Sequence, residues 1–367
     1  MIIELICVLA SLYGDVPDSK HAWAVHDMNR PKPSKVEPAQ KCGGAPSDAI
    51  VLFDGSKESF KRNWCDGKGN ESKWRLGSEG DFYCEKGWVN GGGIFTREKF
   101  GDCQLHLEFR HDESIVSTTS GPQMRGNSGV FLMGPSTGYE IQVLESYYTS
   151  KEAKGTPNYV DNYADGQAGA VYAENPPMVN PARKPGEWQT YDIVFHQPVW
   201  DGEKLLHPGS VTVFFNGVLV QDHWEFEGLT THCRRRPLAP HAEKGPLFFQ
   251  DHGCKVHFRN IWYRPLPSRW DNKTHSKLSA NEKDVMELRR KTAESLFAAI
   301  PNPAKGDADT LIALAEVISY ANEGVYKKAF EAALEAYGKN PVDKHRVNKA
   351  LSVLVRCGVV PNSVIIK

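Results

Sequence analysis

A short segment near the middle of the chain combines two carboxyl groups and an amide at spacings that suit shared chemistry. In the stretch YEIQVLE the polar residues are Glu140, Gln142 and Glu145. Alternate residues of a β-strand share a face, so Glu140 and Gln142 point the same way while the apolar residues beside them face the core. Glu145 has the wrong parity, and a one-residue β-bulge near Val143–Leu144 would bring it to the same face. We therefore expect two carboxyl groups on one concave surface, with an amide between them.

Two carboxyl groups on one surface are typical of glycoside cleavage. A pair about 5 Å apart serves retaining glycosidases as nucleophile and acid/base, and wider pairs serve inverting ones. The spacing E-x-Q-x-x-E resembles the E-x-D-x-x-E strand of laminarinase-type β-sandwich glycosidases, with Gln142 in place of the Asp. That Asp tunes the nucleophile in those enzymes, so Gln142 argues against ordinary retaining hydrolysis. A plainer interpretation, three polar residues on an exposed sheet face, stays open.

Other segments supply further polar residues that we expect around the same surface. They are Arg125 and Asn127 before the strand SGVFLM, Asp165, Gln167 and Tyr172 in the Gly-rich segment YADGQAGAVY, and Gln250 and His252 at the end of the strand PLFFQ. A histidine at a strand end can act as a base, bind a metal or simply lie on the surface. We predict that Glu140, Glu145 and His252 are catalytic and that Gln142 and the remaining residues bind substrate.

The segments that must position these residues have the pattern of short strands separated by Gly, Pro and Asn. Alternating runs such as CQLHLEFR (103–110) and WQTYDIVFH (188–196) predict strands with one buried face. Asn216-Gly217 between two β-rich runs is the strongest hairpin signal. Residues 48–267 are therefore predicted to form a mainly β domain, an antiparallel jelly-roll β-sandwich of the concanavalin-like type.

The pattern changes after Pro267. Ser279 and Glu282 form a capping box, and four segments with helical spacing follow. Residues 275–367 are predicted to form an α-helical domain. Its polar residues read as solvated faces, so we expect it to dock another protein or to self-associate.

Bulk properties narrow the function further. The 367 residues carry a net charge of −1, which gives no electrostatic reason to expect nucleic acid or an anionic membrane as a partner. The one basic run, Arg234, Arg235 and Arg236, is interpreted as a solvated loop, with a phosphate site as the alternative. Residues 1–47 predict an atypical export signal or N-terminal arm followed by a linker, and their apolar run is too short to span a bilayer. The protein is therefore expected to be exported, either periplasmic or extracellular.

A family resemblance rests on several motifs that occur in order. They include AIVLFDGS, RGNSGVFLMG, YEIQVLES, YADGQAGAVY, PGEWQTYDIVFH, VTVFFNGVLVQD and GPLFFQDHG, between about residues 48 and 266. Together they resemble the 3-keto-disaccharide hydrolase family, which has a concanavalin- or laminin-G-like jelly roll. The segment VHDMNRPKP also resembles N-terminal stretches of exported bacterial members.

The resemblance implies a substrate, an oxidised glucoside or disaccharide whose glucose C3 is a ketone. The ketone acidifies the C2 proton, so a base can remove it and the enolate can expel the group on C1; water then adds, which gives net hydrolysis. A divalent metal on the 3-keto and 2-hydroxyl oxygens is a further option that no ligand spacing requires. Two alternatives stay open: a retaining β-glucan glycosidase and a non-catalytic carbohydrate-binding module.

Overall fold

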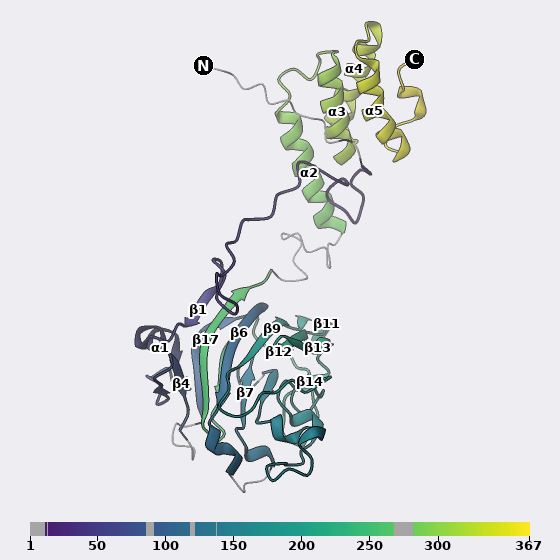
Figure 1. The fold of residues 1–367 in the computed structure, drawn as a ribbon. Helices are drawn as coiled ribbons and strands as arrows, with labels where there is room; N and C mark the ends of the chain where they lie inside the picture. Colours follow the sequence, from purple (N-terminus) through teal and green to yellow (C-terminus); the bar gives the residue numbers. More distant parts are fainter. Residues whose placement is uncertain (1–11, 13, 86–91, 118–121, 137, 268–281) are drawn as a thin grey trace. The chain divides into compact units, whose positions relative to one another are not determined.

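The structure is a computed structural model that describes residues 12, 14–85, 92–117, 122–136, 138–267 and 282–367. The chain divides into two compact units (Figure 1). Lys35–Ser268 forms one, and Met1–Ser34 together with Arg269–Lys367 forms the other. The first unit is mainly β with antiparallel sheets, and the second is helical.

The larger sheet of the β unit carries one face of the core. Its strands are β1 (Ile50–Phe53), β3 (Arg75–Leu76), β4 (Asp81–Tyr83), β6 (Cys103–His111), β9 (Gln189–His196), β12 (Ser210–Phe215), β13 (Val218–Glu225) and β17 (Val256–Pro265). They lie in the order β13-β12-β9-β6-β17-β4-β3, and β1 also pairs with β17. The predicted hairpin is confirmed, because Asn216 and Gly217 join β12 to β13 with φ of 52° and 77°, as a type I′ turn requires.

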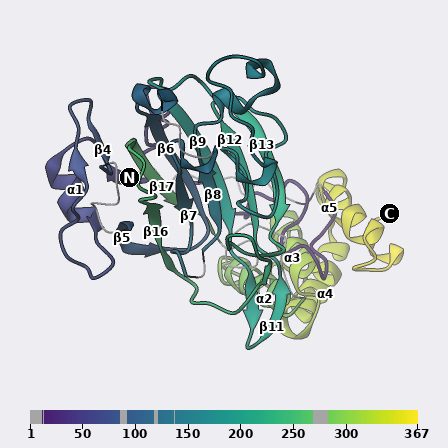
Figure 2. The ribbon, with the colours of Figure 1, turned by 90° about the horizontal axis from the view of Figure 1, so that it is seen from below.

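The smaller sheet carries the residues of the opening motif. Its strands are β2 (Trp64–Cys65), β5 (Gly93–Phe100), β7 (Ser128–Phe131), β8 (Glu140–Val143) and β16 (Gly245–Gln250), in the order β2-β5-β16-β7-β8. Figure 2 shows β16, β7 and β8 in this unit. The β7–β8 pairing runs from Ser128↔Val143 to Phe131↔Glu140. Opposite residues share a face, so Glu140 lies on the same side of the sheet as Phe131.

The two sheets bury their apolar faces against each other. One contiguous cluster of buried side chains contains Leu105, Phe109, Tyr191, Ile193 and Phe258 from the larger sheet and Ile94, Val130, Ile141, Val143 and Phe249 from the smaller one. Ile141 and Val143 are fully buried, as the alternation of YEIQV predicts. The strand that holds the candidate carboxylate is thus anchored through its other face.

Smaller elements complete the β unit. They are α1 (Lys57–Asn63), the pair β10 (Val199–Asp201) and β11 (Lys204–His207), and the pair β14 (Gly228–Leu229) and β15 (Arg236–Pro237). The loop 230–235 connects β14 to β15. Arg234 and Arg235 belong to this loop, and Arg236 is the first residue of β15.

Four described helices form the second unit: α2 (Glu282–Ala298), α3 (Ala308–Tyr320), α4 (Gly324–Lys339) and α5 (Lys344–Arg356). The side chain of Asp307 accepts a hydrogen bond from the N–H of Thr310 at 2.9 Å and caps α3. α3 packs against the other three helices. Ser279 of the predicted capping box lies outside the described residues.

The N-terminal segment packs on these helices, which the sequence analysis did not anticipate. Leu12 joins the helical core, and Asn29 Nδ2 donates to Glu316 Oε1 at 2.6 Å. The hydroxyl of Tyr320 donates to the buried carboxyl of Asp27. Residues 1–11, which hold most of the predicted export signal, lie outside the described residues. Within the described part of the chain, no helix has the length and apolar character needed to cross a membrane.

Candidate active site

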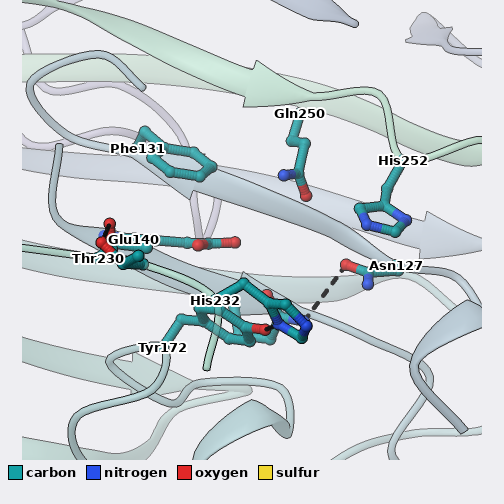
Figure 3. A pocket seen from close by; sticks show the side chains of 10 residues that line it. Asn127, Phe131, Glu140, Tyr172, Thr230, His232, Gln250 and His252 are labelled. Atoms are coloured by element: carbon teal, nitrogen blue, oxygen red, sulfur yellow. Dashed lines mark hydrogen bonds between the residues drawn. The ribbon is translucent and has the colours of Figure 1, made fainter. Parts of the chain in front are cut away.

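A cavity of about 220 Å³ opens where three strands of the smaller sheet meet two loops (Figure 3). Its lining residues are Asn127, Phe131, Glu140, Gln142, Tyr172, Thr230, Thr231, His232, Gln250 and His252. β7, β8 and β16 supply one wall, and the segments around residues 172 and 230–232 supply another. The volume suits a single sugar ring.

Glu140 is the one carboxylic acid among the described residues that line this cavity. Only 3% of it is exposed, and this burial raises the pKa of its carboxyl group to about 8. Gly129 on β7 leaves space for the carboxyl group, because a Cβ at that position would lie 2.2 Å from Glu140 Oε1. A group with such a pKa can take up or release a proton near neutral pH.

Gln142 is the neighbour of Glu140 on the same face of β8. With its NH₂ group turned toward Glu140, it donates to Glu140 Oε1 at 3.0 Å and to the Ser128 carbonyl at 3.2 Å. The opposite orientation turns the NH₂ group to Asn127 Oδ1 at 3.3 Å. The first orientation satisfies both ends of the amide, so we assign it on hydrogen-bonding grounds. Gln142 then holds the Glu140 carboxyl group in place.

The Gly-rich segment YADGQAGAVY runs along the free edge of β8. The N–H of Tyr172 donates to the Glu140 carbonyl at 3.1 Å, and the N–H of Gly169 donates to the Gln142 carbonyl at 3.0 Å. These bonds extend the sheet by a short bridge at Ile141↔Val171. Pairing with β8 therefore fixes Tyr172 beside Glu140, although the two residues are far apart in sequence.

Tyr172 and His232 form a hydrogen-bonded pair at the edge of the cavity. The Tyr172 hydroxyl lies 2.8 Å from His232 Nδ1. Burial raises the pKa of Tyr172, so its hydroxyl keeps the proton at neutral pH. On the chain just before His232, the hydroxyl of Thr230 accepts a hydrogen bond from the Glu140 N–H at 3.0 Å. This bond holds the loop 230–235 against β8.

The remaining polar groups line the cavity from other elements. His252 follows β16, and burial lowers its pKa, which keeps the imidazole neutral at physiological pH. Gln250 projects from β16, and Figure 3 shows its amide pointing toward the space beside Glu140. Asn127 is held by a hydrogen bond of its Nδ2 to the Gln123 carbonyl at 2.7 Å. The cavity thus combines one carboxyl group with amide, hydroxyl and imidazole groups.

The geometry corrects the prediction that Glu145 shares this cavity. β8 ends at Val143, and the β7–β8 register contains no shift, so the expected bulge is absent from this pairing. The Glu145 carboxyl group is buried against Arg125, with Oε2 2.9 Å from Nη2. Burial raises the pKa of Glu145, although Arg125 and the Tyr148 N–H oppose the shift. Neither Glu145 nor Arg125 lines the cavity, and together they form a buried ion pair.

Two other predicted substrate-binding residues also lie outside this cavity. Asp165, in the short 3₁₀ turn Ala164–Gly166, lines a second cavity next to the first. Gln167 accepts a weak hydrogen bond from the Thr149 hydroxyl at 3.4 Å and lines neither cavity.

Several lining residues escaped the sequence analysis. Phe131, Thr230, Thr231 and His232 are the ones it did not single out. Phe131 read as an ordinary strand residue. The sequence THC directly before the Arg triplet was a visible signal, but tertiary contacts bring it to Glu140: the hydrogen bond of Thr230 to β8 and that of His232 to Tyr172.

The described residues do not offer a ready metal site. No group of three or more His, Cys, Asp or Glu side chains among them is placed to hold an ion. Glu140, His232 and His252 line the same cavity without forming such a cluster. The divalent metal considered from the sequence therefore stays a prediction, and we derive no step through one.

The fold and the cavity do not by themselves define the class of protein, and comparison with known proteins assigns it to a carbohydrate-active family. The family model of 3-keto-alpha-glucoside-1,2-lyase-like domains matches residues 48–264. This match spans more than half of the chain, so the chain belongs to that family. The resemblance found in the sequence motifs is thereby confirmed.

One solved structure supports the same class. A putative glycosyl hydrolase from Parabacteroides distasonis is 36% identical, with a TM-score of 0.54, and the match covers 67% of this chain and 98% of that protein. A second putative glycosyl hydrolase from the same organism is 21% identical with a TM-score of 0.43, and the match covers 64% of this chain and all of that protein. No curated protein matches this chain.

Proposed function

We propose that this protein cleaves 3-keto-glucosides by removing the C2 proton and eliminating the group on C1. The observation that carries the proposal is that the described residues lining the cavity include a single carboxyl group, the buried one of Glu140. Ordinary glycosidases need two carboxyl groups on opposite sides of the scissile bond. Elimination next to a ketone needs one base, and the family assignment points to the same chemistry.

Glu140 is the base in this mechanism. With a pKa of about 8, the Glu140 carboxylate is a stronger base than an ordinary carboxylate. Roughly a tenth of the protein molecules carry Glu140 in its deprotonated form at pH 7. The carboxylate takes the proton from C2, and the C2–H electron pair moves into an enolate whose charge rests on the C3 oxygen. The amides of Asn127 and Gln250 are suited to stabilise that oxygen by hydrogen bonds.

The departing oxygen also needs a proton. The Tyr172–His232 pair lies at the edge of the cavity and carries a proton on the Tyr172 hydroxyl. When the enolate collapses, the C1–O bond breaks and this hydroxyl protonates the leaving oxygen. The sugar product has a C1–C2 double bond conjugated to the ketone, and addition of water to it completes net hydrolysis. His252, which is neutral, is suited to orient that water.

We further propose that the two sheets have the concanavalin-like jelly-roll connectivity and that the protein acts outside the cytoplasm. The ordered strand motifs support the first point, and the apolar N-terminal run supports the second.

The decisive experiment pairs each 3-keto-glucoside with its unoxidised counterpart and follows the products by mass spectrometry. We expect release of the leaving group from the 3-keto compound alone, with an unsaturated intermediate 18 mass units below the hydrated sugar, a difference that equals one water. In D₂O, recovered substrate or product should carry deuterium at C2. Equal rates on both compounds would instead indicate a glycosidase, and binding without turnover would indicate a binding module.

A further inference from the structure

A second cavity adjoins the proposed active site. Its volume is about 350 Å³, and its lining residues are Tyr163, Asp165, Tyr172, Ala173, His232, Cys233, Arg234 and Arg235. Tyr172 and His232 line both cavities, so their hydrogen-bonded pair forms the boundary between them. A ligand that passes this pair would occupy both spaces at once.

The second cavity has aromatic and cationic groups where the first has amides. Tyr163 is 42% exposed, its hydroxyl lies 3.3 Å from that of Tyr172, and both tyrosines contribute aromatic surface to the lining. Arg234 forms no ion pair with any other residue that the structure describes. Arg235 has only a long, exposed contact with Glu227 at 3.9 Å, which contributes little. Both guanidinium groups are therefore available to a ligand.

The charge of the lining favours an anion. The lining residues include two arginines, Arg234 and Arg235, and one acid, Asp165. A guanidinium group binds a carboxylate through two parallel hydrogen bonds, and a neighbouring aromatic ring stacks on a flat or ring-shaped ligand. The Arg run interpreted from sequence as a solvated loop thus lies beside the point where the leaving group departs.

We propose that the second cavity is the leaving-group subsite and that it selects leaving groups in which a ring carries a carboxylate, such as a phenolic acid or a uronic acid. This inference rests on the proposed function, because it assigns the sugar to the first cavity. Arg234 and Arg235 are then the specificity-determining residues, and Tyr163 packs against the ring.

The test compares charged and neutral leaving groups of the same shape. We would use the 3-keto-glucosides of 4-hydroxybenzoate and of its methyl ester, and as a second pair the 3-keto-glucosyl derivatives of glucuronic acid and glucose. In the double variant R234Q/R235Q, kcat/KM should fall about tenfold for the two acids and stay within twofold for the neutral partners. The matched control is R236Q, since Arg236 belongs to β15 and does not line the cavity. R236Q should leave kcat/KM unchanged for the acids and for their neutral partners.

The contrast between the two acids identifies the source of the carboxylate. An effect confined to one pair assigns the subsite to aromatic or to uronic acids. Equal losses for acids and neutral partners, or no loss for either acid, would overturn the proposal.

Binding measurements separate this inference from the proposed reaction. The unoxidised glucosides of 4-hydroxybenzoate and its methyl ester can be titrated calorimetrically into wild type and both variants. The acid should bind more tightly to wild type than the ester, and its advantage should shrink at high salt and vanish in R234Q/R235Q. Charge-selective binding without any turnover of 3-keto compounds would overturn the reaction only. Turnover with no charge selectivity would overturn the subsite only.

Discussion

At the scale of single residues, the environment of Glu140 decides what the cavity can do. Burial alone is the cause of its raised pKa. Residues from three different elements contact Glu140. Gly129 leaves space for its carboxyl group, the Gln142 amide donates to that carboxyl group, and the Thr230 hydroxyl accepts a hydrogen bond from its backbone N–H. The sheet therefore holds a weak acid where a substrate ring can reach it.

Replacing Glu140 with Gln should abolish most turnover, because the amide cannot accept the C2 proton. We expect kcat to fall by about 10²–10⁴-fold, the range typical of a lost acid–base group. As the control, Glu174→Gln changes another carboxyl group whose pKa is raised by burial but which lies outside the cavity, and it should keep its turnover. Activity of Glu140→Gln within a few-fold of wild type would mean that the base lies elsewhere, with His252 as the next candidate.

The activity of the wild type should also follow the ionisation of Glu140. As a base, it acts only when deprotonated, so kcat/KM should rise as the pH increases through about 8 and then level off. If Glu140 instead donated a proton, kcat/KM would fall above about 8. A pH profile measured with one 3-keto-glucoside distinguishes the two roles.

The same pKa makes a prediction about stability. Below pH 4.5 the Glu140 carboxyl group is protonated in both folded and unfolded chains, and between 4.5 and about 8 only the folded protein retains the proton. The contribution of Glu140 to the free energy of unfolding therefore decreases as the pH rises through that range. Glu140→Gln removes the effect, so its free energy of unfolding relative to wild type should increase by about 1.4 kcal/mol per pH unit there. Denaturant titrations at pH 5, 6.5 and 8 test this, and a constant difference would contradict it.

At the scale of elements, β8 shows what its sequence could and could not predict. The alternation of YEIQV correctly placed the apolar residues in the core and Glu140 and Gln142 on the other face, because parity is a local property of a strand. The position of Glu145 depended on whether the strand continued past Val143; the strand ends there, and the Glu145 carboxyl group pairs with Arg125, a tertiary contact. The loop 230–235 was equally hidden, since only its docking on β8 brings His232 to the cavity.

This reassignment of Glu145 can be tested by Glu145→Gln. The substitution leaves the Arg125 guanidinium group buried without its counter-charge, so we expect a loss of about 3 kcal/mol in unfolding free energy. Turnover per folded molecule should change little. A large loss of kcat without loss of stability would restore Glu145 as a catalytic acid.

The close approach of β7 to the Glu140 side chain predicts the effect of Gly129→Ala. The new methyl group would lie 2.2 Å from Glu140 Oε1, so the carboxyl group must shift. We expect at least a tenfold loss of kcat. Gly338→Ala, where an added Cβ meets no other atom within 4 Å, is the control and should leave turnover unchanged. Unchanged kinetics in Gly129→Ala would show that the position of Glu140 is not critical.

At the scale of the whole molecule, the chain contains two units with separate cores. The described cavity-lining residues all belong to Lys35–Ser268. The sequence indicated the change from strands to helices after Pro267, because hydrophobic periodicity changes there from two to about 3.6. It gave no sign that residues 12–29 pack on the helices, since those contacts join segments nearly 300 positions apart, as between Asn29 and Glu316.

Removal of the helical unit should therefore leave a folded and active β unit. Deleting residues 275–367 alone takes away the partners of Leu12 and Trp23, which pack on the helices, and so exposes apolar side chains. We expect the fragment 35–274 to unfold cooperatively and to keep most of the wild-type kcat/KM on a 3-keto-glucoside. The fragment 1–274 should have the same activity but aggregate more readily. Circular dichroism, thermal unfolding and light scattering on both fragments check this. If fragment 35–274 fails to unfold cooperatively, the β unit depends on the helices, and the boundary between the units is not a folding boundary.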